Sequence, residues 1–116
     1  MLTSYTINVL NGYKCKWQGY YIGRANQGRK GSALANPFKL KDPKNEIERA
    51  EVIEKYRQWL WQQIQSKNAL VLGELEELRQ ILLREGTVSL LCYCSPNLCH
   101  GDVIKACLIW IIENNV

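Results

Sequence analysis

The pattern of apolar and polar residues predicts three extended segments. Residues 4–11 are rich in β-forming residues and predict a first strand, and the segment that ends in Tyr-Tyr-Ile-Gly at 20–23 predicts a second. Residues 87–94, Thr-Val-Ser-Leu-Leu-Cys-Tyr-Cys, form a continuous apolar run. Such a run is typical of a central strand that is buried on both faces. A further short strand at 70–72 also fits the pattern.

The helical period predicts three helices. An amphipathic helix is expected at 46–66, with Asn45 as its N-cap, and a second at 73–85, which ends at Gly86 in the C′ position. The third covers 102–114 and is apolar almost all round, so we expect it to be largely buried. Two tryptophans beside the apolar stripe of the first helix are better explained by core packing than by base stacking: Trp59 and Trp61.

The order of these elements predicts the fold class. Strand, strand, long loop, two helices, strand and helix indicate an α/β fold: a small single-domain sandwich over residues 1–116, with a central, mostly parallel sheet and about three helices. The loop at 24–43 has no periodicity, and loops of this length inside a compact domain are usually functional or disordered. Phe38 follows a proline and favours an ordered loop that is anchored to the core.

Composition and charge limit the classes of protein and ligand that fit this chain. The chain is 47% hydrophobic and 22% charged, as in ordinary globular proteins. It has no apolar stretch of the roughly 20 residues that a membrane span needs and no signal-peptide pattern, so we expect a cytoplasmic protein without a membrane partner. Residues 1–41 contain seven basic and no acidic side chains, whereas the remainder contains eight basic and eleven acidic ones. Such asymmetry favours an anionic ligand, either a phosphorylated small molecule or nucleic acid.

The segment 92–102 concentrates the candidate chemistry. Cys92, Cys94, Cys99 and His100 could form a metal site, but the Cys-x-Cys and Cys-His spacings fit a tetrahedron badly, so we expect no metal and no cofactor. In the reducing cytoplasm, five cysteines are unsuited to a disulfide framework.

A second interpretation of this segment is a reactive thiol. Cys99 comes just before a predicted helix N-terminus, where the thiol pKa is lowered and anions bind. Asp102 is the expected N-cap, Gly101 allows a tight turn, and His100 could orient or deprotonate a neighbouring group.

The third interpretation is packing. Cys92 and Cys94 alternate on a strand and so share one face, and Cys107 lies within an apolar helix. Packing is the expected role of these three cysteines, and the interpretation is weaker for Cys99 and His100.

Three motifs carry a family resemblance. The stretches "YIGR" at 21–24, "NPF" at 36–38 and "LLCYCSPNLCHGDVI" at 90–104 resemble the domain of unknown function family 4326, which occurs in bacteria and often in their phages. More remotely, the cysteine-histidine turn is similar to that of the family numbered 488. The resemblance implies a compact α/β domain in which the motifs meet at one site. The chain departs from the usual pattern at 32–35, where "SALA" replaces an expected tryptophan-glycine pair.

The leading functional hypothesis is a pocket for a phosphate-bearing small molecule such as a nucleotide. Arg24, with Arg29 or Lys30, would clamp the phosphate, the amides of the last motif would assist, and an aromatic ring would stack on a base. A phage-type protein that only sequesters a nucleotide signal would need nothing more. The expected ligand-binding residues are Tyr21, Gly23, Arg24, Arg29, Lys30, Asn36, Phe38, Cys99, His100, Gly101 and Asp102.

Two alternatives remain open. An enzyme that processes a nucleotide or nucleobase would use the same pocket, with Cys99 and His100 as catalytic residues. A nucleic-acid-binding or metal-stabilised module is supported by the basic first third and its aromatic residues. Four tryptophans and a widened helix face also make a homodimer an expectation.

Overall fold

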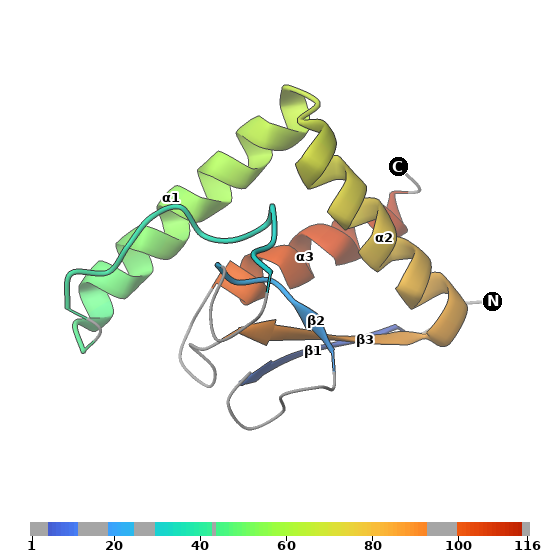
Figure 1. The fold of residues 1–116 in the computed structure, drawn as a ribbon, viewed down its shortest axis with the longest axis horizontal. Helices are drawn as coiled ribbons and strands as arrows, with labels where there is room; N and C mark the ends of the chain where they lie inside the picture. The colour runs from blue at the N-terminus through green and yellow to red at the C-terminus, as the bar shows by residue number, and fades with distance from the viewer. Residues whose placement is uncertain (1–4, 12–18, 25–29, 43, 93–99, 115–116) are drawn as a thin grey trace.

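The strands form one parallel sheet. The computed structural model describes residues 5–11, 19–24, 30–42, 44–92 and 100–114 (Figure 1). Within them, β1 (Thr6–Asn11), β2 (Tyr20–Tyr21) and β3 (Thr87–Cys92) are arranged in the order β1-β3-β2, and both pairings are parallel. β3 is the middle strand, so the prediction that the apolar run starting at residue 87 forms a central strand is confirmed. The predicted α/β fold class is confirmed as well.

Local signals determine where the first two helices begin and end. Helix α1 (Glu46–Gln65) starts after Asn45, whose side chain accepts a hydrogen bond from the backbone N–H of Glu48. Helix α2 (Ala69–Glu85) ends at Gly86, which has a left-handed φ of 76° that favours glycine. Both of these predicted caps are confirmed.

The start of α2 corrects the sequence analysis. We expected this helix to begin at 73 and left room for a short strand at 70–72, but both expectations are wrong because α2 already begins at Ala69. The side chain of Asn68 accepts hydrogen bonds from the backbone N–H groups of Leu70 and Val71 and thereby caps the helix. Val71 is buried, so it extends the apolar stripe by one turn.

Helix α3 (His100–Glu113) differs from expectation in two ways. It begins at His100, so Asp102 lies in the first turn and is not the N-cap. It is also not largely buried: Ile104 and Leu108 are fully enclosed, but Ile109 and Trp110 are 39% and 47% exposed. The reason is that α3 packs against the sheet and the other two helices along one side only, which leaves the rest of its apolar surface uncovered.

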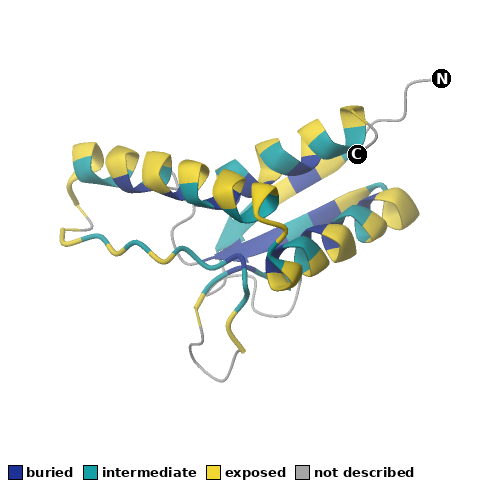
Figure 2. Ribbon diagram, turned by 90° about the horizontal axis from the view of Figure 1, so that it is seen from above, coloured by how far each residue is buried: buried dark blue, intermediate teal, exposed yellow. Residues whose placement is uncertain are grey.

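The three helices lie on the same side of the sheet (Figures 1 and 2). The buried residues, dark blue in Figure 2, follow the inner surfaces of the helices and the sheet, and one hydrophobic core joins all the helices to the sheet. Leu90 and Cys92 of β3 belong to this core, whereas Leu91 points to the opposite face by alternation and is also buried. The end of β3 is thus buried on both faces, as its apolar sequence predicts.

The tryptophans of α1 have different environments. Trp59 is partly buried and its ring centroid lies 5.5 Å from that of Tyr56, so the predicted core packing is confirmed for this residue. The prediction of core packing is wrong for Trp61, which is 50% exposed. The ring of Trp61 contacts that of Trp110 edge-on, with the ring centroids 6.3 Å apart. These two rings line a groove of about 580 Å³ between α1 and α3. The homodimer stays a prediction.

None of the helices in the described part of the chain is long and apolar enough to span a membrane.

Candidate functional site

The carboxyl ends of the parallel strands meet at one edge of the sheet. Asn11 of β1 is the register partner of Cys92 in β3, and Tyr21 of β2 is the partner of Leu91. The backbone N–H of Ile22 donates to the carbonyl of Leu91 at 3.0 Å and prolongs this pairing into the first motif. In open α/β sheets, ligands bind outside the carboxyl ends of the strands. We call residues 21–24, 36–38 and 100–102 around this edge the carboxyl-edge site.

His100 joins the strand end to the last helix. Its Nε2 lies 2.7 Å from the carbonyl oxygen of Ile22, and because a carbonyl only accepts, the ring nitrogen donates. The imidazole is 6% exposed and contacts the Tyr56 ring edge-on at a centroid distance of 5.1 Å. The imidazole is thus enclosed between the end of the first motif and α1. A role of His100 in ligand binding or catalysis stays a prediction.

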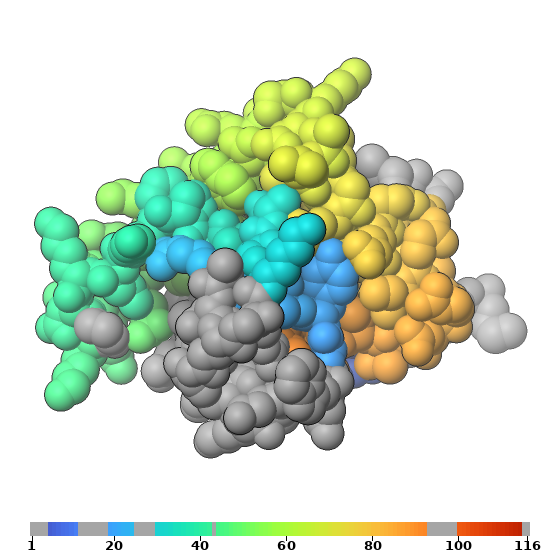
Figure 3. All heavy atoms as spheres, in the orientation of Figure 1, coloured from blue at the N-terminus to red at the C-terminus, as the bar shows by residue number. Residues whose placement is uncertain are grey.

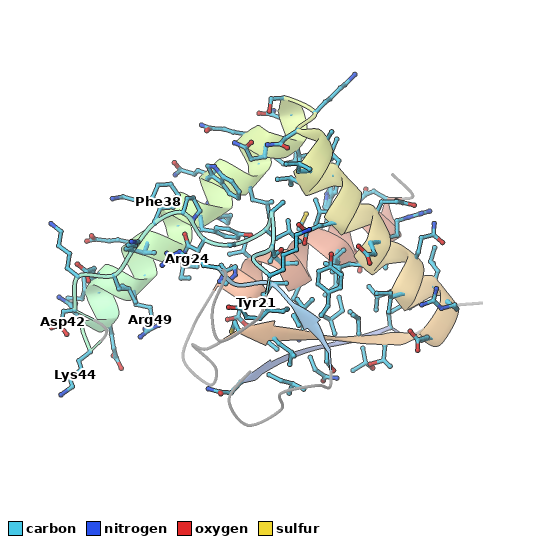
Figure 4. All side chains as sticks on the ribbon, in the orientation of Figure 1. Tyr21, Arg24, Phe38, Asp42, Lys44 and Arg49 are labelled. Carbon is cyan, nitrogen blue, oxygen red and sulfur yellow. The ribbon has the colours of Figure 1, made fainter. Side chains whose placement is uncertain are left out.

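Arg24 joins the first motif to the second. Its Nε donates to the carbonyl of Asn36 at 2.9 Å and its Nη2 to the carbonyl of Phe38 at 3.1 Å, although the residue is exposed. The hydroxyl of Tyr21 donates to the carbonyl of Arg24 at 2.5 Å. The guanidinium is thus held in place by the protein, and among the described residues its Nη1 has no acceptor. Figure 4 shows Tyr21, Arg24 and Phe38 close together, with Arg49 of α1 on the side of the helix toward the sheet.

The Asn-Pro-Phe motif has its own local turn. The side-chain Oδ1 of Asn36 accepts a hydrogen bond from the backbone N–H of Phe38 at 2.9 Å, which bends the chain around Pro37. Phe38 is partly buried and packs against the hydrophobic core. The prediction that this phenylalanine anchors the loop is confirmed. Its position orients the two carbonyl groups that receive the Arg24 guanidinium.

Gly23 allows a close approach of the Tyr21 side chain. A Cβ at position 23 would lie 2.5 Å from the Tyr21 hydroxyl and 2.7 Å from the ring carbon that bears it. A larger residue would push this ring aside and weaken its hydrogen bond to Arg24. The carbonyl of Gly23 also accepts from the backbone N–H of Ser32 at 2.9 Å, so the loop returns to the strand end here.

The "SALA" segment supplies the inner anchor of the loop, where the resemblance led us to expect a tryptophan-glycine pair. Leu34 is fully buried, and its carbonyl accepts a hydrogen bond from the hydroxyl of Tyr56 at 2.7 Å. Ser32 and Ala33 both donate to the carboxylate of Glu74 on α2. The sequence analysis assigned Tyr56 to the core and missed its hydrogen bond, although a buried tyrosine hydroxyl usually has a partner. No local signal identified Glu74.

The other residues predicted for the ligand site lie in different places. Gly101 is buried and Asp102 is exposed in the first turn of α3, the end at which the dipole of a helix favours anions. Lys30 is exposed at the start of the loop. Arg29, Cys94 and Cys99 lie outside the described residues, so their roles stay predictions.

The described thiols occupy apolar surroundings. Cys92 is 1% exposed within the core, which confirms its predicted packing role. Cys107 is partly buried, and this burial raises the pKa of its thiol to about 11. No group of three or more histidine, cysteine or acidic side chains that could hold a metal ion occurs in the described part of the chain. Since two of the clustered cysteines lie outside that part, the expectation of no metal also stays a prediction.

Comparison with known proteins supports the family resemblance. No curated protein and no solved structure matches the chain. The model of one family, described as a domain of unknown function (DUF4326), matches residues 8–110, a range that includes all three motifs. The chain therefore belongs to the DUF4326 family.

Proposed function

We propose that this protein binds a phosphate-bearing small molecule, a nucleotide or a nucleotide-derived signal, at the carboxyl-edge site. The observation that carries the proposal is the hydrogen bond between His100 and Ile22, which brings the first turn of α3 to the strand end that leads into Arg24. A fixed guanidinium and the N–H groups of a helix start are the two groups that proteins most often use to hold phosphate.

The charge of the loop supports an anionic ligand. Lys30, Lys39 and Lys41 are exposed along it, and the described residues before Asp42 include no acidic side chain. Glu48 lies nearby, but one of its carboxylate oxygens accepts from the backbone N–H groups of Lys41 and Asp42. Asp102 is the acidic group of the α3 first turn. Its exposed carboxylate would accept hydrogen bonds from hydroxyl groups of a ligand, as a ribose would offer, while the phosphate lies toward Arg24.

Binding without turnover is the version that the geometry favours. His100 is buried and its Nε2 is used in a hydrogen bond to the backbone, so this nitrogen is not placed to act as a general base. An enzymatic mechanism would then depend on Cys99 or on the other ring nitrogen of His100. We therefore propose a cytoplasmic binding protein, of the kind with which a phage withholds a nucleotide signal from its host.

A thermal-shift screen tests the proposal. We would compare purine and pyrimidine nucleotides with their nucleosides, with inorganic phosphate and with pyrophosphate. The expected result is a rise in melting temperature for at least one nucleotide and a much smaller rise for the matching nucleoside. If no phosphate-bearing compound shifts the melting temperature, the proposal is contradicted. Binding to DNA or RNA oligonucleotides that weakens steeply with salt would favour the nucleic-acid alternative instead.

A pair of arginine variants tests the location of the site. Arg24→Ala should weaken binding of the nucleotide about 10-fold or more, the effect of losing a hydrogen bond to a charged group. Arg84→Ala is the matched control: it removes the same charge, and Arg84 is exposed and pairs with Glu85 at the end of α2, next to the amino end of β3 and away from the site. Equal affinities in the two variants would show that Arg24 does not contact the ligand.

A further inference from the structure

The carboxylate of Glu74 connects α2 to two segments from distant parts of the sequence. Its Oε1 accepts from the hydroxyl of Ser32 at 2.5 Å and from the hydroxyl of Tyr20 at 3.0 Å, and its Oε2 accepts from the backbone N–H of Ala33. Glu74 and these contacts are partly buried. In Figure 3 the atoms of the loop segment (cyan) lie against those of α2 (yellow).

The neighbouring Glu77 has a different role. It is exposed and accepts a hydrogen bond from Tyr20 at 3.1 Å, and no hydrogen bond in the described residues joins it to the loop. Burial, followed by hydrogen bonds to the two glutamates, raises the pKa of Tyr20 far above its usual range, so the phenol keeps its single proton, which lies between the two carboxylates. Of these two carboxylates, only that of Glu74 contacts the described part of the loop.

A carboxylate suits this position well. All three groups around Glu74 donate hydrogen bonds, and a carboxylate accepts at both of its oxygens. A glutamine of the same shape would keep an oxygen for the backbone N–H of Ala33, but its NH₂ group would face the hydroxyls of Ser32 and Tyr20, which would have to turn and accept from it. The hydrogen bonds to a charged group would be replaced by weaker neutral ones, so the start of the loop would be held less firmly.

A series of hydrogen bonds leads from Glu74 to the carboxyl-edge site. The Ser32 hydroxyl, which donates to Glu74, accepts from the backbone N–H of Leu34 at 3.0 Å. The carbonyl of Leu34 accepts from Tyr56. A few residues later, the carbonyl groups of Asn36 and Phe38 receive the Arg24 guanidinium. The segment that Glu74 holds is thus the beginning of the loop that orients Arg24.

We propose that Glu74 is a positioning residue of the carboxyl-edge site, which fixes the start of the loop on α2 and so places Arg24 and Phe38 before a ligand binds. This inference rests on the proposed function, because the site is assigned there. Preorganisation of this kind increases affinity by reducing the ordering that binding would otherwise require.

The test compares Glu74→Gln with Glu77→Gln, which changes the same chemistry one turn away. Hydrogen exchange without ligand should show the amides of Ala33 and Leu34 exchanging at least about 10-fold faster in Glu74→Gln, while amides in the middle of α2 keep their rates. The affinity for the nucleotide found in the screen should fall about 10-fold in the same variant. Glu77→Gln should change neither measurement. Ser32→Ala removes one of the three donors and should give a smaller change in the same direction at Ala33, even if Glu74→Gln fails to fold; Leu34 is not compared in this variant, because its N–H donates to the Ser32 hydroxyl itself.

The outcomes separate the two proposals. Unchanged exchange at Ala33 and Leu34 in the Glu74 variant overturns the positioning role, whether or not a nucleotide binds. Faster exchange with unchanged affinity overturns it as well, because the loop would then be irrelevant to the ligand. If the wild-type protein binds no nucleotide, the proposed function fails, and faster exchange in Glu74→Gln still assigns the placement of the loop to Glu74.

Discussion

The Nε2 of His100 and the carbonyl oxygen of Ile22 lie 2.7 Å apart, although the two residues are 78 positions apart in the sequence. The bond joins the Cys-His-Gly-Asp motif to the Tyr-Ile-Gly-Arg motif and lies beneath the surface, since Ile22 is fully buried and His100 nearly so. The family motifs therefore meet through the protein core, and the polar residues that follow them are placed as a consequence.

Replacement of His100 should destabilise the protein. His100→Phe keeps an aromatic ring beside Tyr56 but leaves the buried carbonyl of Ile22 without its donor, which should lower the free energy of unfolding by about 1–3 kcal/mol. Asp102→Ala is the comparison, because Asp102 is exposed in the helix first turn and should cost only about 0.3–1 kcal/mol. Urea denaturation measures both. Equal losses in the two variants would contradict the structural role of the imidazole.

The hydrogen bond from Tyr56 to Leu34 should also contribute to stability. Tyr56→Phe removes a buried donor from the carbonyl of Leu34 and should lower the free energy of unfolding by about 1–3 kcal/mol. Tyr5→Phe serves as the control, because Tyr5 is only partly buried and its hydroxyl has no acceptor among the described residues. A Tyr56 variant that is as stable as the control would show that the loop is not anchored at this point.

Stability should decrease at high pH partly because of Tyr20. Burial, followed by interactions with Glu74 and Glu77, raises the pKa of this phenol in the folded protein. Above the ordinary tyrosine pKa of about 10, the unfolded chain loses this proton while the folded protein keeps it, so the free energy of unfolding falls as the pH rises. Between about pH 9 and 11, a window around the ordinary tyrosine pKa, the Tyr20→Phe variant should therefore lose less stability than the wild type does. Parallel stability curves would contradict the raised pKa.

Cys107 should react slowly with alkylating reagents. Because burial raises the pKa of its thiol to about 11, the reactive thiolate is scarce at pH 8. Iodoacetamide should modify Cys107 at least about 10-fold more slowly in the folded protein than in denaturant, as followed by mass spectrometry of the peptide that contains it. Equal rates would show that this cysteine is accessible and not part of the packed helix face.

The sequence predicted the features that depend on short-range interactions. Asn45 and Gly86 were identified because capping depends on neighbouring backbone groups, and the apolar run of β3 indicated its central position. The start of α2 was predicted four residues too late, although the side chain of Asn68 that caps it is a short-range signal of the same kind. The exposure of Trp61 and Trp110 was not predictable, because it depends on how the helices pack around a small sheet.

The sequence predicted several residues of the candidate site, but not the contacts that orient them. Arg24 was expected at a strand end, but the carbonyl groups that orient it belong to residues 36 and 38, which only the folded loop brings to it. His100 was interpreted as a group at the surface of a pocket, because its buried partner is far away in the sequence. Glu74 resembles any other polar helix residue until Ser32 and Ala33 are placed beside it.

The central claim is that a phosphate-bearing ligand binds at the carboxyl edge of the sheet, and its most direct test is an NMR titration. Backbone amide signals would be followed as the nucleotide from the thermal-shift screen is added. The account predicts that the largest shifts occur at Gly23, Arg24, Phe38 and Gly101, while the indole signals of Trp61 and Trp110 in the groove between α1 and α3 remain unchanged. Saturable shifts centred on the two indoles, with none at the carboxyl edge, would contradict it.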